Sequence, residues 1–214
     1  MEKIQRTKFN VSLLGESQVG KTCMASVFTG QPFNIQVLST IGLENFLAIE
    51  KFDGKEYKFK IFDTAGQEKY RSIALNTVNL SDGFLLVFAV NNRKSFEILE
   101  EWIKSIEDKC DIKKKVLILV GNKVDIEKRE VKNEEAVAFA KSKNIDYFET
   151  SAKTGFGIKE IFHKVFESVY KKNKENEKLE KLENEQNNQM EKERPSVTLE
   201  KRNENIKEKK GGCC

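Results

Sequence analysis

The residues whose types and spacing most clearly allow chemistry lie between Gly15 and Thr22, in the run GESQVGKT. This run fits the pattern G-x-x-x-x-G-K-[ST], and it follows a strand-like segment and opens a helix-like one, as the pattern requires. Backbone N–H groups of such a loop can surround phosphate oxygens. Lys21 adds a positive charge for the β- and γ-phosphates, and Thr22 adds a hydroxyl ligand for Mg²⁺. A flexible glycine-rich turn is the plain alternative, and the strand–helix context disfavours it.

Two further motifs follow strand-like segments and carry groups that can bind a purine base. The first is Asn122-Lys123-Val124-Asp125, in the kind of loop that builds the binding crevice of a parallel sheet. Guanine presents its N1–H and its amine side by side, so the carboxylate of Asp125 can accept from both, whereas adenine has no such pair. The second is Glu149-Thr150-Ser151-Ala152-Lys153, whose backbone amides can meet the base oxygen. Each motif alone is a weak signal, but their order after the phosphate loop indicates guanine.

The elements that must position these motifs alternate between strand-like and helix-like patterns. Asp53-Gly54 separates two strand-like segments, and this dipeptide favours a two-residue hairpin turn because both positions tolerate positive φ. The expected elements are strands at about 9–13, 46–52, 56–62, 83–90 and 115–121, a helix at 21–28 and a final helix at about 158–170. The continuous apolar strands suit the covered centre of a sheet. The pattern therefore predicts a mostly parallel α/β sheet with the hairpin as its antiparallel edge.

Charged residues make up 34% of the 214 residues, and they concentrate beyond the final expected helix. From Lys171 to Gly212 the chain has 12 Lys or Arg and 10 Asp or Glu, against six apolar residues. So little apolar surface cannot offset the entropy of ordering the chain. We therefore expect a folded domain over residues 1–172 and a charged, largely disordered tail over residues 173–214.

The formal charge of +4 fits a solvated surface better than a nucleic-acid patch, because no basic run is interleaved with aromatic residues. No apolar run is long enough to span a bilayer, and the first residues lack a signal peptide's apolar core, so we expect a cytosolic product. Cys23 and Cys110 are then expected to be reduced and to act as small buried hydrophobic residues. His163 lies off the apolar stripe of the final helix and is expected in solvent, whereas Trp102 is expected in the core.

Taken together, these motifs resemble those of the small GTPases, and the resemblance covers about residues 8–172. It implies a P-loop NTPase G domain, an α/β fold whose mostly parallel six-stranded sheet has one antiparallel edge hairpin and helices on both faces. It also implies GTP or GDP and Mg²⁺ as ligands. Phe33, Lys123 and Lys153 would pack against the base, and the Gly66 amide would touch the γ-phosphate. The implied nucleotide contacts are Gly15, Ser17, Gln18, Val19, Gly20, Lys21, Thr22, Cys23, Phe33, Thr40, Asp63, Gly66, Asn122, Lys123, Asp125, Ser151, Ala152 and Lys153.

The resemblance also implies a metal site and a set of catalytic residues. Thr22, Thr40 and Asp63 would hold Mg²⁺, with Asp63 acting through a water and Thr40 only when the γ-phosphate is present. Gln67 would orient the attacking water, and Thr40 and Lys21 are the other expected catalytic residues. Hydrolysis would then proceed by in-line attack of water, through positioning and charge stabilisation.

The segment from Gln31 to Phe46 contains no Lys or Arg, so it offers no arginine in cis. We therefore expect slow intrinsic hydrolysis, which a partner's arginine would accelerate about 10³- to 10⁵-fold. The alternative, from a different class, is a non-hydrolysing scaffold with the same fold that recruits partners constitutively. Intact Gln67, Thr40, Thr22 and Asp63 argue against it.

The end of the sequence, GGCC, resembles the Rab branch, whose paired cysteines both receive geranylgeranyl groups; here these are Cys213 and Cys214. One lipid chain gives marginal membrane binding and two give stable anchoring. The resemblance implies a monomeric, membrane-anchored switch in vesicle trafficking, on the cytoplasmic face of intracellular membranes and cycling with the cytosol. Its expected partners are an exchange factor, a GTPase-activating protein, a prenylation escort and effectors, with no nucleic acid.

The runs STIG, DTAGQEKYRS and NRKSFEILEEWI also look Rab-like, but the surface expected to meet partners departs from the usual Rab pattern. Tyr70 matches an aromatic triad, whereas Phe62 replaces its tryptophan and Asn45 replaces its phenylalanine. Residues 77–81 stand where Tyr-Tyr-Arg-Gly-Ala is usual, and Val37 replaces an aromatic residue that covers the phosphates. We expect these changes to alter effector choice and to leave GTP binding intact.

Overall fold

The computed structural model describes residues 7–34, 40, 42–66 and 71–193, with side chains described as far as residue 182. It comprises two units, Met1–Asn176 and Glu177–Cys214. The strands are β1 (Lys8–Leu14), β2 (Leu43–Phe52), β3 (Lys55–Thr64), β4 (Gly83–Ala89), β5 (Val116–Asn122) and β6 (Asp146–Glu149). The helices are α1 (Lys21–Phe28), α2 (Arg71–Asn76), α3 (Arg93–Glu97), α4 (Leu99–Glu107), α5 (Asn133–Ser142) and α6 (Ile158–Glu193), with short 3₁₀ turns at Val78–Leu80 and Ile112–Lys114.

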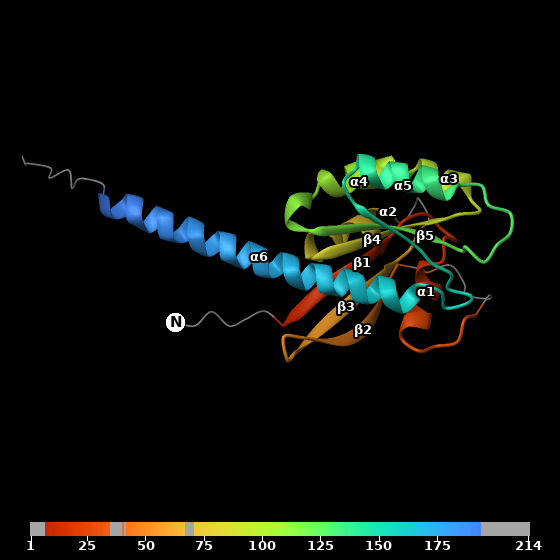
Figure 1. The fold of residues 1–214 in the computed structure, drawn as a ribbon, viewed down its shortest axis with the longest axis horizontal. Coiled ribbons are helices and arrows are strands. Elements are labelled where there is room, and N and C mark those ends of the chain that lie inside the picture. Colours follow the sequence, from red (N-terminus) through yellow and green to blue (C-terminus); the bar gives the residue numbers. More distant parts are fainter. Residues whose placement is uncertain (1–6, 35–39, 41, 67–70, 194–214) are drawn as a thin grey trace, which may run out of the picture. The chain divides into compact units, whose positions relative to one another are not determined.

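The six strands form one sheet in the order β2-β3-β1-β4-β5-β6 (Figure 1). All neighbouring strands are parallel except β2 and β3, which confirms the predicted α/β fold with one antiparallel edge hairpin. From β1 the chain continues to one side through β3 and to the other side through β4. Ligands of open α/β sheets bind beyond the carboxyl ends of the strands at such a switch point, so the fold directs attention to the end of β1.

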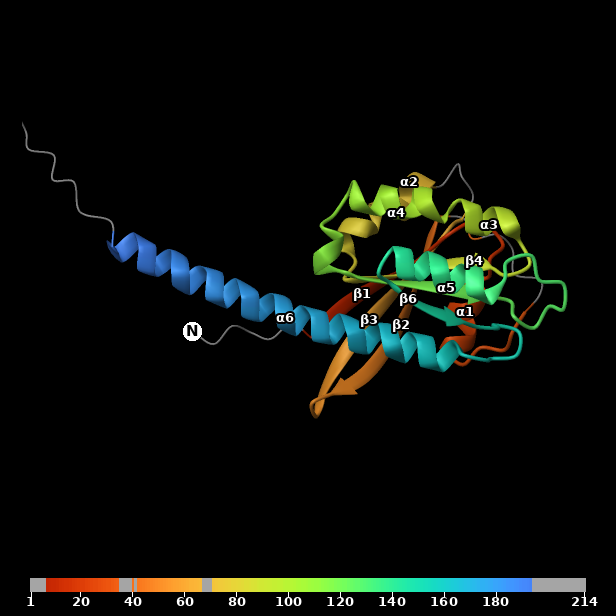
Figure 2. The same cartoon turned by 45° about the horizontal axis from the view of Figure 1, so that its top comes forward.

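Helices cover both faces of the sheet, because the central strands alternate apolar side chains between two cores. On β4, Leu85 and Val87 belong to the core that α1 and α6 cover. Leu86 and Phe88 belong to the opposite core, which is covered by α2 to α5. Figures 1 and 2 show the two helical layers on either side of the sheet. The continuous apolar runs predicted from the sequence are therefore central strands buried on both faces.

The predicted hairpin turn joins β2 to β3. Asp53 and Gly54 both have positive φ, 50° and 74°, as a two-residue turn between twisted strands requires. The pairing runs from Phe52 opposite Lys55 to Leu43 opposite Thr64, so β2 begins earlier than the predicted start at Phe46. The extra residues are paired because β3 continues alongside them.

The last helix runs to Glu193, well past the boundary at residue 172 that composition suggests. Within the described side chains, Lys171 pairs with Glu167 at 2.6 Å and Lys172 with Glu175 at 3.7 Å. Pairs of opposite charge three or four residues apart stabilise a helix whose surface is polar all round. Composition reflects only how little apolar surface the segment can bury, whereas these pairs depend on the spacing of charges along a helix. The first part of the segment expected to be disordered is therefore helical in the structure.

The sequence also predicted the surroundings of one tryptophan, one histidine and two cysteines. Trp102 is confirmed as core, and His163 is largely exposed, with its Nδ1 3.6 Å from a carboxylate oxygen of Glu50. Cys23 and Cys110 are free thiols as predicted, and their predicted burial is confirmed in part, because both are partly buried and pack against the cores. Cys23 faces the cavity described below, and Cys110 lies in the turn that follows α4.

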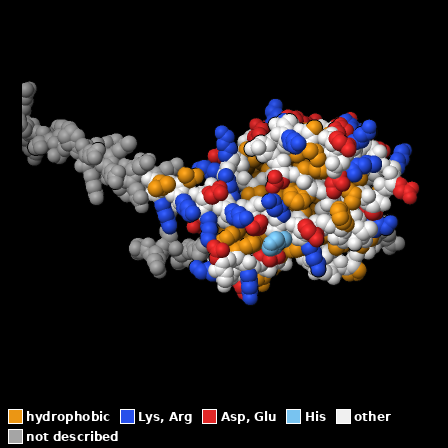
Figure 3. Space-filling model, in the orientation of Figure 1, with side chains coloured by type: hydrophobic (Ala, Val, Ile, Leu, Met, Phe, Trp, Pro, Cys, Tyr) orange, Lys and Arg blue, Asp and Glu red, His pale blue; other side chains and the backbone are white. Residues whose placement is uncertain are grey.

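The face shown in Figure 3 has basic and acidic side chains interspersed, with hydrophobic side chains between them. No helix in the described part of the chain has the length and apolar character needed to span a membrane.

Candidate nucleotide-binding site

The loop between β1 and α1 can form only with glycine at two of its positions. Gly15 and Gly20 have φ of 133° and 98°, in the region that side chains rarely adopt. A Cβ on Gly15 would come within 2.1 Å of the Val87 carbonyl oxygen, and one on Gly20 within 2.4 Å of Asn122 Nδ2. Gln18 also has positive φ, 61°. The loop backbone is therefore held close to β4 and β5 while it opens helix α1.

Lys21 begins helix α1, and its ammonium group is buried under this loop. Its Nζ donates to the carbonyl oxygens of Gly15 and Glu16, both at 2.9 Å. Burial lowers the pKa of Lys21 to about 8, although the charges of Asp63 and Glu16 partly oppose this shift. A Cβ on Gly66 would lie 2.5 Å from Lys21 Nζ, so the Gly66 backbone passes directly beside the ammonium. An anionic ligand here would meet a cation that carbonyl dipoles stabilise only partly.

The three predicted metal ligands converge beside Lys21. Asp63 Oδ2 accepts from Thr22 Oγ1 at 2.6 Å and from Thr40 Oγ1 at 3.2 Å, and the two hydroxyl oxygens are 2.7 Å apart. Asp63 Oδ1 is buried without a hydrogen-bond partner in the described part of the chain. Burial raises the pKa of Asp63, against the hydrogen bond from Thr22 and the charge of Lys21. A buried carboxylate oxygen without a partner beside two hydroxyls fits the oxygen donors that Mg²⁺ takes.

The described residues contain no group of three His, Cys, Asp or Glu that could hold a metal without other ligands. The cation would need phosphate oxygens and water to complete its shell, which is how Mg²⁺ is usually bound with nucleotides.

The other end of the site is organised by Asn122, the last residue of β5. Its Nδ2 donates to the Val19 carbonyl at 2.8 Å, and its Oδ1 accepts from Ala152 N and from Thr150 Oγ1, both at 3.2 Å. One buried side chain thus joins the phosphate loop to the loop after β6. Ser151 Oγ donates to Asp125 Oδ1 at 2.6 Å, which orients the carboxylate expected to recognise guanine.

A cavity of about 510 Å³ joins these two ends. Among the predicted nucleotide contacts, those that line it are Ser17, Gln18, Gly20, Lys21, Thr22, Cys23, Phe33, Thr40, Gly66, Asn122, Lys123, Asp125, Ala152 and Lys153. Gly15, Val19, Asp63 and Ser151 do not line it; all four are buried and hydrogen-bond to residues that do. Fourteen residues from distant motifs therefore share one cavity with a basic phosphate end and a carboxylate at the base end.

Comparison with known proteins agrees with this geometry. A family model described as Ras family matches residues 10–171. The chain belongs to the Ras family. It is 36% identical over 174 residues to the Ras-related protein Rab-13 of Canis lupus familiaris, covering 81% of this chain and 85% of that protein. It is 38% identical over 165 residues to the Ras-related protein Rab-8A of Gallus gallus, covering 76% and 78%. The chain is thus a Rab-type small GTPase, a member of a family of guanine-nucleotide-binding GTP hydrolases.

Three residues of this Ras-family cavity were missed by the sequence reasoning: Asn34, Thr64 and Ile126. Each of them directly follows a predicted contact in the sequence. Extending the predicted motifs by one residue would therefore have identified them. Gln67, the residue expected to orient water, lies outside the described residues, as do Val37 and Tyr70 of the expected partner surface. Cys213 and Cys214 lie outside them as well.

One departure from the usual Rab pattern, Asn45, lies on the outer face of β2. Asn45 is exposed and lies opposite Phe62 of β3, which is itself buried. Leu47 and Ile49 are 74% and 59% exposed and lie on the same side of the strand as Asn45. Phe46 points to the other face and packs against the core. It is therefore not placed to substitute for a phenylalanine at position 45.

Proposed function

We propose that this Rab-type chain is a molecular switch that binds GTP or GDP with Mg²⁺ and hydrolyses GTP slowly. The observation that carries the proposal is that one cavity joins a site suited to a guanine base and a site suited to phosphates and a metal ion. At one end, Asp125 is oriented by Ser151 at 2.6 Å. At the other end, Thr22, Thr40 and the buried Asp63 bring their oxygens together beside Lys21. A nucleotide whose base and phosphates bound these two ends would span the cavity.

In this proposal each group of the chain has a defined task. Lys21 and the loop backbone bind the β- and γ-phosphates, and the Gly66 amide positions the γ-phosphate beside them. Thr22, Thr40 and Asp63 hold Mg²⁺, which when bound would neutralise charge on the phosphate oxygens. Gln67 orients the attacking water. Thr40 would complete the metal shell only when the γ-phosphate is present, so its position would depend on which nucleotide is bound.

The rate of this reaction is proposed to depend on a partner. The segment from Gln31 to Phe46 has no Lys or Arg to stabilise the charge that develops during transfer. An activating protein that inserts an arginine would raise the rate about 10³- to 10⁵-fold.

A single-turnover assay tests the proposal. The protein is loaded with GTP in EDTA, excess Mg²⁺ is added, and GDP formation is followed for wild type and Gln67→Leu. We expect slow hydrolysis by wild type and slower hydrolysis by Gln67→Leu, with equal GTP affinity. Gln31→Leu, the same substitution at an exposed position outside the cavity, is the matched control and should match wild type. Tight GTP binding without any hydrolysis by wild type would instead favour the scaffold alternative.

We further propose that Cys213 and Cys214 carry geranylgeranyl groups and that the chain acts on intracellular membranes in vesicle trafficking, cycling with the cytosol. Two lipid chains anchor a protein stably where one does not. The nearby Lys207, Lys209 and Lys210 support the proposal, since basic residues near a membrane are attracted to anionic lipid. Replacing both cysteines by serine should leave nucleotide exchange normal and move the protein to the soluble fraction. Equal membrane partitioning of wild type and the double variant would contradict the anchor.

A further inference from the structure

Glu149, the last residue of β6, accepts three hydrogen bonds on one carboxylate oxygen. Asn133 Nδ2 and the Tyr147 hydroxyl each donate to its Oε1 at 2.8 Å, and the Arg129 guanidinium forms an ion pair with the same oxygen. The pair is partly exposed, with side chains 29% exposed for Arg129 and 23% for Glu149. The three donors come from three segments: the loop after β5, the start of α5, and β6 itself. This cluster of Arg129, Asn133, Tyr147 and Glu149 is called the Glu149 knot below.

The Glu149 knot contains residues that belong to the two base-binding motifs or lie close to them in the sequence. Arg129 follows Asp125 in the same loop, and Glu149 immediately precedes the segment that contributes Ala152 to the cavity. On the cavity side the two loops are joined by the Ser151–Asp125 hydrogen bond and by Val124 N donating to the Thr150 carbonyl at 3.2 Å. The knot joins the same two loops through residues that do not line the cavity. The base-binding loops are therefore held together by two separate sets of contacts.

Contacts within the Glu149 knot leave it little freedom to move. Arg129 Nε donates to the Val131 carbonyl at 2.6 Å, so the guanidinium is fixed within its own loop before it reaches Glu149. A Cβ on Gly121 would lie 2.6 Å from the Tyr147 hydroxyl, so Tyr147 packs directly over the backbone of β5. Burial alone would raise the pKa of Glu149, but the bonds from Arg129, Asn133 and Tyr147 hold it below its usual value. The carboxylate is therefore charged at neutral pH and can hold all three donors.

We infer that Arg129 and Glu149 are positioning residues for guanine recognition. By fixing the loop after β5 against the end of β6, they hold Asp125 and the backbone around Ala152 in the geometry that binds the base, and they slow nucleotide release. Neither side chain lines the cavity. The inference rests on the proposed guanine-nucleotide site.

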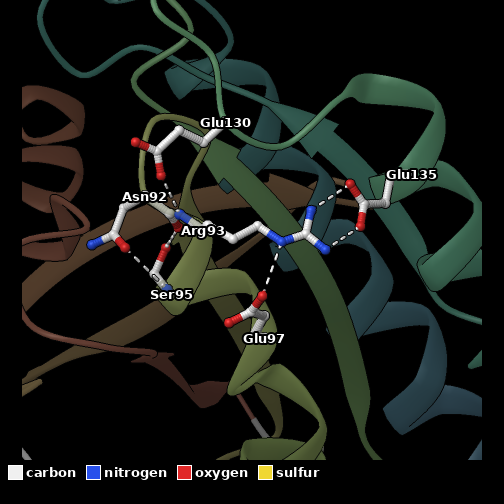
Figure 4. Close-up of polar contacts among 6 residues, drawn as sticks. All are labelled: Asn92, Arg93, Ser95, Glu97, Glu130 and Glu135. Carbon is white, nitrogen blue, oxygen red and sulfur yellow. Dashed lines mark hydrogen bonds and ion pairs between the residues drawn. The ribbon is translucent and has the colours of Figure 1, made fainter.

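A second arginine–glutamate pair provides a matched control. Arg93, at the start of α3, pairs with Glu135 of α5 at 2.6 Å and with Glu97 at 3.1 Å, as Figure 4 shows. Glu135 is 37% exposed, against 23% for Glu149. The Arg93–Glu135 pair thus has similar chemistry and ties α3 to α5. It does not join the two base-binding loops to each other.

The test measures nucleotide release and base discrimination in Glu149→Gln, Arg129→Leu, the double variant and the control Glu135→Gln. Release is followed by chasing a fluorescent GDP analogue with excess GDP in Mg²⁺. Discrimination is the affinity ratio of GDP to inosine diphosphate, which lacks the 2-amino group that Asp125 would accept from. Thermal unfolding of each variant reports folding. Arg129→Lys is added because it keeps the charge but cannot bond both Val131 and Glu149 in the same way.

We expect release to be about tenfold faster in Glu149→Gln and in Arg129→Leu, the rate change for losing one charge-assisted hydrogen bond. The double variant should be no faster than the faster single variant, because the two residues act as one pair. The GDP preference should fall in all variants of the knot, Arg129→Lys included. Glu135→Gln should change release less than about twofold and leave the preference unchanged.

Unchanged release in folded knot variants would overturn the inference. So would faster release with an unchanged GDP preference, because a general loosening of the fold would affect both nucleotides equally. An equal effect of Glu135→Gln would also overturn it. If wild type binds no GDP, the proposed function itself fails, and that outcome is distinct from the others.

Discussion

The two ends of the cavity are built on opposite principles. At the base end, the hydrogen-bonding capacity of Asn122 and Glu149 is largely used within the protein, with three bonds to each side chain. At the phosphate end, Asp63 keeps a buried oxygen without a partner in the described part of the chain, and Lys21 is buried with carbonyl oxygens as its hydrogen-bond acceptors. The base end is therefore largely hydrogen-bonded within the protein, whereas at the phosphate end Lys21 and Asp63 balance each other's charge only in part.

The difference between the two ends affects the stability of the nucleotide-free protein and its affinity for nucleotide in different ways. Satisfied buried networks stabilise the folded protein whether or not nucleotide is bound. Buried charges without full partners lower the stability of the folded protein. A ligand that pairs with them removes this destabilisation and therefore binds more tightly. Substitutions at the base end should therefore lower stability in the absence of nucleotide, and substitutions at the phosphate end should mainly lower affinity.

Asn122→Ala should have the largest effect on the nucleotide-free protein. It leaves the Val19 carbonyl, the Ala152 amide and the Thr150 hydroxyl without their partner, and each loss costs about 1–3 kcal/mol. A loss of roughly 3 kcal/mol corresponds to a fall in melting temperature of about 6–12 °C for a domain of this size. Calorimetry or circular dichroism of nucleotide-free protein measures it. A melting temperature within 2 °C of wild type, taken as about the measurement scatter, would show that the hydrogen bonds of the base end do not stabilise the nucleotide-free protein.

Lys21→Met, at the phosphate end, should mainly lower nucleotide affinity and leave the stability of the nucleotide-free protein nearly unchanged. GTP affinity should fall at least about tenfold, since a charge-assisted bond to phosphate is worth roughly 1.5–3 kcal/mol. The stability of the nucleotide-free protein should change by less than about 1 kcal/mol, because methionine removes a buried charge along with its bonds to Gly15 and Glu16. Titration calorimetry and thermal unfolding measure the two quantities. A large stability loss with little loss of affinity would contradict the proposed difference between the two ends of the cavity.

Asp125→Asn sharpens the comparison by altering recognition within the base end. The amide can no longer accept both guanine donors, so GTP affinity should fall about 10- to 150-fold, as for the loss of roughly 1.5–3 kcal/mol. Xanthosine triphosphate should bind better than to wild type, because the amide now offers a donor where xanthine has an oxygen. Competition binding with both nucleotides measures the shift. If the nucleotide preference does not move, the base binds elsewhere.

Asn45→Phe should have the smallest effect, because it touches neither end of the cavity. Asn45 is exposed, so stability should change by less than about 0.5 kcal/mol. Asparagine presents donors and acceptors that cost about 1–3 kcal/mol if a partner buries them unpaired. Phenylalanine beside exposed Leu47 should therefore raise GTP-dependent affinity for one or more ordinary Rab effectors.

Lys51→Phe, which places the same ring farther along the same face of β2, is the control for added hydrophobicity in a panel of such effectors. An unchanged binding profile for Asn45→Phe would place position 45 outside the effector surface.

Local sequence determined the parts of the molecule that depend on neighbouring residues. The two glycines of the phosphate loop and the Asp53-Gly54 turn were predictable, because positive φ is a property of a residue and its immediate backbone. The central strands were predictable for a similar reason, since a short continuous apolar run is typical of a strand covered on both faces. The family motifs then indicated which cavity residues to expect.

Tertiary structure decided what depends on residues far apart in the chain. The three bonds of Asn122 reach residues on two other loops, and they exist only because the phosphate loop lies close to the end of β5. The Glu149 knot depends on the register that places Glu149 opposite Gly121 in parallel strands. No local pattern encodes that register, because it is set by the packing of the whole sheet. The sequence therefore indicated most residues of the cavity, and the tertiary structure decided which of them hydrogen-bond to one another.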